Sequence, residues 1–183
     1  MKLDTLGDVE ILKRPKVGLF CSVKCPGKLI LETYDLCRRF RDEGIIVASG
    51  FHSPMEEECL RILLRGAHPA IWCLARGMFK VIPKKYRDAV ERGRLVLVSP
   101  FSPKIDRPRA KTALIRNRWV ADMAQVLVVA YAAPGGKTAA FCQEQLAAGK
   151  PLYTFDHPDN AAILRAGARP IAPEIHWNNL LPS

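Results

Sequence analysis

Long apolar runs, closely spaced cysteine pairs and signal-peptide features are missing from this sequence. No apolar stretch reaches the roughly 18 to 20 residues that a membrane helix needs, and the opening MKLDTLGDVEILKRPK has no apolar centre. We therefore expect a soluble, cytoplasmic protein. Its six cysteines lack the spacing of thiolate zinc sites or redox pairs, so we expect reduced packing residues and no metal.

The two common glycine-rich nucleotide fingerprints are also absent. The turn Pro134–Thr138 reads Pro-Gly-Gly-Lys-Thr and resembles the end of a P-loop, but the full Gly-x4-Gly-Lys-Thr spacing is incomplete. No Gly-x-Gly-x-x-Gly segment occurs, which argues against NAD and hydride chemistry. These patterns indicate neither an ATPase nor a bound cofactor.

The composition is that of an ordinary folded domain. The 183 residues are 49% apolar and 25% charged, enough to bury one core and too few for two comfortable ones. We expect a single domain over residues 1–183.

The positive charge is concentrated in one stretch of the chain. Thirteen Lys and Arg but only three acidic residues lie between Arg76 and Arg118, so this window carries the whole formal surplus of ten. A basic solvated face would explain such a window, but so would a polyanion partner such as nucleic acid.

Short apolar runs alternate with amphipathic stretches along the chain, which is typical of an α/β protein with a mainly parallel, doubly wound sheet. We expect buried strands over Lys16–Cys21, Ile45–Ser49, Pro69–Leu74, Leu95–Val98, Val126–Tyr131 and Leu152–Phe155. Helices are expected from Leu29 to Phe40, where apolar residues recur every three to four positions, and over Pro54–Arg65, Pro83–Glu91, Lys111–Met123 and Lys137–Ala148. The stretch Pro100–Pro108 is expected to be an irregular loop.

Small, hydroxylated and cationic residues follow several of these strands. Ligands of open parallel sheets bind outside the carboxyl ends of the strands, where loop amides and helix N-termini face a crevice. Within Arg116-Asn117-Arg118, two helical residues two positions apart point in different directions, so at least one arginine is free for packing or a second contact. A structural role and a phosphate contact are both open, and we expect a phosphate contact from at least one of the two. The residues predicted to bind phosphate groups are Ser22, Lys24, Ser49, Gly50, His52, Arg76, Lys84, Lys85, Arg116, Arg118, Gly135, Gly136, Lys137 and Thr138.

The order of these motifs resembles the Rossmann core of the DNA-processing protein A (Smf) family, within the lysine-decarboxylase-like superfamily. The resemblance runs from about Pro15 to Ile171. It is carried by Val17–Ser22, Gly44–Gly50 with its Ser-Gly pair, Ala70–Met78, Ile82-Pro83, and above all Arg116-Asn117-Arg118 followed by Val126–Val129 and the glycine turn.

This resemblance implies binding of single-stranded DNA, homodimerisation, and transfer of the strand to a recombinase during natural transformation. Ser22, Ser49, Gly50, Lys84 or Lys85, Arg116 and Arg118 match family positions, and Gly135 and Gly136 match approximately. Two departures concern arginines: the family's arginine after Ser-Gly is missing from the segment beginning at His52, and Val23 replaces the first-turn arginine, with Lys24 beside it.

The leading interpretation is a non-catalytic module that binds single-stranded nucleic acid, with Phe79 as the best candidate for base stacking and Trp72 assigned to the core. Two alternatives remain open at this point. One is a sensor for a small nucleotide; the other is a nucleotide N-glycosidic hydrolase similar to the cytokinin-activating phosphoribohydrolases, with Glu56, His52 and Glu144 as its candidate catalytic residues.

Overall fold

The computed structural model describes residues 3–181 and contains one eight-stranded sheet in the order β1-β5-β4-β3-β2-β6-β7-β8. Strands β2 to β8 are parallel to their neighbours, while β1 is antiparallel to β5 at the edge. The strands are β1 (Asp4–Leu6), β2 (Val17–Phe20), β3 (Val47–Ser49), β4 (Ala70–Cys73), β5 (Leu95–Ser99), β6 (Val126–Val129), β7 (Leu152–Thr154) and β8 (Arg169–Pro170).

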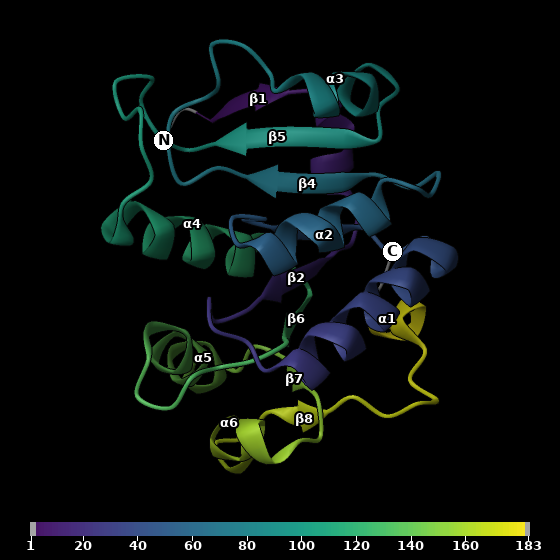
Figure 1. Ribbon diagram of the computed structural model, residues 1–183, viewed down its shortest axis with the longest axis vertical. Helices are drawn as coiled ribbons and strands as arrows, with labels where there is room; N and C mark the ends of the chain where they lie inside the picture. Colours follow the sequence, from purple (N-terminus) through teal and green to yellow (C-terminus); the bar gives the residue numbers. More distant parts are fainter. Residues whose placement is uncertain (1–2, 182–183) are drawn as a thin grey trace.

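Helices cover both faces of the sheet (Figure 1). One face carries α1 (Gly27–Glu43), α2 (Pro54–Leu63), α3 (Lys84–Glu91) and the 3-10 turn η3 (Trp177–Leu180). The other carries η1 (Val9–Lys13), α4 (Ala110–Met123), α5 (Lys137–Ala147) and α6 (Ala161–Arg165). A further 3-10 turn, η2 (Pro158–Asn160), leads into α6. The doubly wound α/β fold is therefore confirmed.

Strand periodicity explains the two cores. In β2, Val17 and Leu19 pack under α1 and α2, whereas Phe20 packs on the opposite face against Phe141 of α5, with 4.8 Å between ring centroids. Side chains buried on both faces leave no polar alternation, which is why the strands were recognisable as short apolar runs.

The helix boundaries follow from local sequence. Gly44 ends α1 in the left-handed conformation, with φ of 74°. Ser53 begins α2 with a capping box: its hydroxyl accepts from the amide of Glu56, whose carboxylate accepts from the amide of Ser53.

Six of the observed strands and five of the helices fall within a few residues of their predicted ranges. The edge strands β1 and β8 were not predicted, because two or three residues are too few to show a periodic pattern. The C-terminal segment packs on the body through Trp177, which contacts Phe40 and Tyr153. Pro182 and Ser183 lie outside the described residues. In the part of the chain that the structure describes, no helix is long and apolar enough to cross a membrane.

Candidate functional site

The start of the positive window and the glycine turn lie at the same edge of the sheet, whereas Arg92 and Arg94, between α3 and β5, lie at the opposite edge. Because β4 and β6 run in the same direction, Arg76 after β4 and the turn Pro134–Thr138 after β6 both lie at the carboxyl edge. Helix α4 begins at this edge as well, after the irregular loop that follows β5. A ligand-binding crevice at the carboxyl ends of the strands, as predicted from the sequence, requires this arrangement.

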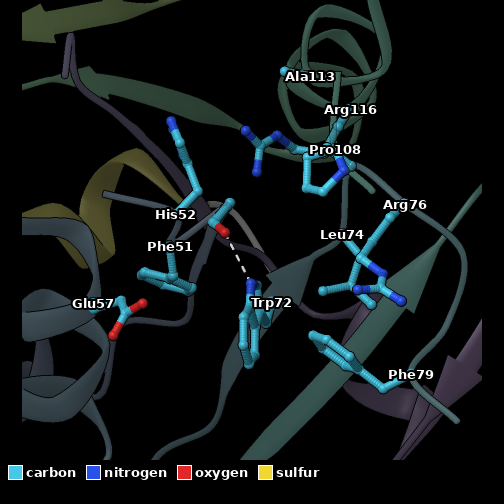
Figure 2. A pocket seen from close by; sticks show the side chains of 12 residues that line it. Phe51, His52, Glu57, Trp72, Leu74, Arg76, Phe79, Pro108, Ala113 and Arg116 are labelled. Carbon is cyan, nitrogen blue, oxygen red and sulfur yellow. Dashed lines mark hydrogen bonds between the residues drawn. The ribbon is translucent and has the colours of Figure 1, made fainter. Parts of the chain in front are cut away.

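A pocket of about 160 Å³ opens at this edge, where β3 and β4 end (Figure 2). We call it the β3–β4 pocket. Its walls come from the two strand ends, from the loop after β4 and from the first half of α4. The residues that line it include Gly50, His52, Trp72, Arg76, Phe79 and Arg116.

Arg116 reaches this pocket from α4, and its side chain is almost wholly buried, with 2% of the residue exposed. Its Nη1 donates to the Cys73 carbonyl at 3.2 Å, and its Nε donates to Asn117 Oδ1 at 2.8 Å. Arg116 forms no salt bridge with any carboxylate among residues 3–181. Burial lowers the pKa of Arg116, and the Glu56 carboxylate only partly opposes this shift. Such a charge is costly unless an anion completes its shell.

Gly50 is the position that admits the Arg116 guanidinium. A Cβ built on Gly50 would lie 1.4 Å from Nη1 of Arg116, so any side chain there would displace the guanidinium. The glycine that follows Ser49 at the end of β3 is therefore needed to leave room for Arg116. Ser49 itself is fully buried, and its hydroxyl has no hydrogen-bond partner among residues 3–181.

Glu56 lies under the same turn and is 2% exposed. Its Oε2 accepts hydrogen bonds from the amides of His52 and Ser53 at 3.3 and 3.1 Å and from the Ser53 hydroxyl at 2.9 Å, and lies 2.8 Å from His52 Nδ1. Burial alone would raise the pKa of Glu56, but the contacts from His52 and Ser53, together with the positive charge of Arg116, lower it. Glu56 is thus a fixed carboxylate that orients His52, whose half-exposed ring faces the pocket.

Two aromatic rings form the opposite wall. Trp72 and Phe79 lie 5.5 Å apart between centroids, and the Trp72 indole donates to the Gly50 carbonyl at 2.8 Å. The Arg76 guanidinium lies over the Phe79 ring, 5.1 Å from its centroid. In Figure 2 the Arg116 side chain points from α4 toward His52, while the two rings face it from below.

The assignment of Trp72 to the core was therefore incomplete. The side chain is half-buried and lines the pocket, although it also packs against Tyr86 with 5.0 Å between ring centroids. A signal was available in the sequence: Trp72 is the penultimate residue of β4, so its side chain stands near the carboxyl edge where ligands bind.

The predicted phosphate-binding residues separate into two groups and a remainder. Gly50, His52, Arg76 and Arg116 line the β3–β4 pocket. A second hollow, which we call the α4–α5 groove, lies between those two helices and contains Arg118, Lys137 and Thr138. The two arginines thus serve opposite sides of α4, as their spacing predicts. Neither hollow is lined by Ser22, Lys24, Ser49, Lys84, Lys85, Gly135 or Gly136.

Several residues of this remainder have structural contacts. The Ser22 hydroxyl accepts from the Ala133 amide at 2.9 Å and so joins the loops after β2 and β6. Lys85 forms a salt bridge with Glu57 at 3.1 Å, whereas Lys24 and Lys84 are exposed. Gly135 has a φ of 66°, and a Cβ on Gly136 would lie 2.9 Å from the Ala133 carbonyl. These two glycines shape the turn itself.

The three candidate hydrolase residues do not converge. His52 lines the β3–β4 pocket with Glu56 beneath it, but Glu144 lies in the α4–α5 groove and is bound to Arg118 at 2.8 and 2.7 Å. Within residues 3–181, no group of three or more His, Cys, Asp or Glu side chains is placed to hold a metal ion.

Together these features define a Rossmann-type α/β protein with a cationic, aromatic-walled pocket at the carboxyl edge of its sheet. The model of one family, DNA recombination-mediator protein A, matches residues 2–172. The chain belongs to this family. No curated protein sequence gives a match.

Solved structures share the fold at low sequence identity. DNA processing protein A from Helicobacter pylori, described as having a unique single-stranded DNA binding mode, has a TM-score of 0.78 and 18% identity over 98% of this chain and 85% of its own. The Streptococcus pneumoniae protein has a TM-score of 0.76 and 17% identity over 92% of this chain; the match spans only 62% of that protein. The molybdenum cofactor binding protein of Rippkaea orientalis has a TM-score of 0.62 and 11% identity over 87% of this chain and 90% of its own.

Proposed function

We propose that this protein binds single-stranded DNA at the carboxyl edge of its sheet, as a non-catalytic component of DNA recombination. The observation that carries the proposal is Arg116, a buried guanidinium that lines an open pocket and has no carboxylate partner among the described residues. A phosphodiester would supply the missing negative charge. The family assignment and the H. pylori relative point to the same ligand.

The pocket walls suit the two parts of a nucleotide. Arg116 and Arg76 provide donors for phosphate oxygens, while Trp72 and Phe79 provide apolar surface for a base. Stacking on aromatic rings contributes about 1 to 3 kcal/mol per base and tolerates any sequence. We therefore expect binding that depends strongly on salt and weakly on base identity.

Fluorescence anisotropy with labelled oligothymidylates tests the proposal. Affinity should rise with strand length and fall steeply with salt, because each phosphate contact to a single strand adds about 0.7 to the log–log slope. Arg76→Ala should reduce that slope, while Lys13→Ala, at the opposite edge before β2, should not. Equal affinity for a nucleoside monophosphate and a long strand would instead identify a nucleotide sensor and refute strand binding.

A cytoplasmic location, a homodimer and a recombinase that receives the strand complete the proposal, with residues 1–183 acting as one domain. These elements rest on the family assignment. Analytical ultracentrifugation with and without an oligonucleotide tests the dimer. Co-purification with a bacterial recombinase in the presence of single-stranded DNA tests the partner.

A further inference from the structure

The α4–α5 groove has a volume of about 660 Å³ and lies outside the β3–β4 pocket. Ala113, in the first turn of α4, lines both hollows, so they adjoin across this single turn of helix. The side chains that decide what the groove can hold are Lys111, Leu114, Arg118, Lys137, Phe141 and Glu144.

The charge of the groove is positive where the two helices begin. Lys111 and Lys137 are exposed in the first turns of α4 and α5, and neither forms a salt bridge within residues 3–181. No acidic residue lies in either first turn, and no side chain of the described residues caps the α5 N-terminus at Gly136. Two helix ends and two lysines therefore act on the same space.

The single acid of the groove is already neutralised. Both oxygens of the Glu144 carboxylate are bound by Arg118, two turns farther along the helices from Lys111 and Lys137. Arg118 thus neutralises Glu144, the one acidic side chain in the described lining of the groove, at a distance from the lysine end. The groove thus keeps a net positive charge that no group in its lining balances.

The floor of the groove is apolar. Leu114 is 38% exposed, one of the few large apolar side chains so exposed among the described residues, and it lies with Phe141 and small alanines in the lining. A floor of this kind beside cations matches a nucleotide, which has an apolar base face and an anionic phosphate. A purely acidic peptide would leave Leu114 without a partner.

We propose that the α4–α5 groove is a second nucleotide-binding station, which receives the continuation of a strand held in the β3–β4 pocket. This proposal rests on the proposed function. The strand crosses the first turn of α4 at Ala113, places a phosphate between Lys111 and Lys137, and lays a base over Leu114. Because a helix is about 10 to 12 Å across, the two stations are separated by only a few nucleotides.

Binding of DNA strands of different length distinguishes this proposal from the proposed function, because only a long strand can reach both the β3–β4 pocket and the α4–α5 groove. We would measure binding of oligothymidylates of about 4 and about 12 nucleotides by anisotropy for the wild type, for Lys111→Ala/Lys137→Ala and for Arg116→Met. The matched control is Lys13→Ala/Arg92→Ala, which removes equal charge at the opposite edge, before β2 and β5.

The double groove variant should bind the long strand at least about 5-fold more weakly, with a salt slope lower by about 1.4, as expected for two lost phosphate contacts. Its affinity for the short strand should match that of the control. Equal binding of the long strand by the groove variant and the control overturns the second station. Unchanged binding of both strands by Arg116→Met overturns the proposed function instead.

Lysine acetylation read by mass spectrometry gives a measurement on the unaltered protein. The long strand should protect Lys111 and Lys137 from the reagent, and the short strand should not, while Lys13 stays reactive with either. Equal protection by the two strands, or none by either, also overturns the second station.

Discussion

Replacing Arg116 with methionine should weaken binding of single-stranded DNA without a matching loss of stability. Methionine keeps the length and flexibility of the side chain but removes its charge and donors. Loss of a charge-assisted hydrogen bond to phosphate costs about 1.5 to 3 kcal/mol. We therefore expect roughly a 10- to 100-fold lower affinity.

The expected change in the free energy of unfolding follows from the surroundings of the Arg116 guanidinium. The folded protein loses the bonds of this charged donor to the Cys73 carbonyl and Asn117, which together contribute roughly 3 to 6 kcal/mol, and leaves the carbonyl unpaired. Against this stands the penalty of a buried charge with no carboxylate within salt-bridge distance among the described residues, of several kcal/mol. The unfolding free energy should then stay within about 2 kcal/mol of wild type, or rise.

Urea unfolding followed by circular dichroism measures the stability, and anisotropy measures the binding. A fall of about 3 to 5 kcal/mol in the unfolding free energy would refute the reasoning, because that is the cost of breaking a buried ion pair. Arg116 would then be the structural partner of Glu56, and weaker DNA binding would be a secondary effect.

Three further predictions concern the same pocket. Gly50→Ala should displace the Arg116 guanidinium, whose Nη1 would lie 1.4 Å from the new Cβ, and weaken DNA binding as much as removing Arg116; unaltered affinity would contradict this. Phe79→Ala should cost about 1 to 3 kcal/mol of binding with little change in the salt slope, since stacking is lost and no phosphate contact is. Glu56 has a lowered pKa, so its charge stabilises the folded state above the ordinary value of 4.5, and this contribution disappears as the pH falls through the folded value. The stability difference between wild type and Glu56→Gln in urea titrations should therefore shrink on acidification, and a constant difference would contradict the assignment.

The parallel core of the fold could be predicted because its information is local. The apolar runs at β2 to β7 are bounded by glycines, prolines and charged residues, and helices α1 and α2 have a clear apolar face. Strands β1 and β8 could not be found this way, since each gains its structure by pairing with a distant edge of the sheet.

The kinds of residue at the site could be predicted from the sequence, but their division between the β3–β4 pocket and the α4–α5 groove could not. Arg76, Arg116, Lys137 and the Ser-Gly turn were all expected at the carboxyl edge, and the structure places them there. Helix α4 lies between the two hollows because of the path that the loop after β5 takes across the sheet edge. The pattern of apolar residues in the sequence does not predict that path. The burial of Arg116 against Gly50 is likewise a contact between residues far apart in sequence.

Trp177 holds the last described residues against the rest of the protein. Its ring sits against Phe40 near the end of α1, and Asn178 donates to the Glu43 carbonyl, so residues 177–181 lie by the amino edge of the sheet. A biotin or dye attached at Asn179, which is exposed in η3, would consequently project from the side remote from the β3–β4 pocket. Surface immobilisation through that position should leave the proposed DNA path accessible to solution and suit single-molecule measurements of strand capture.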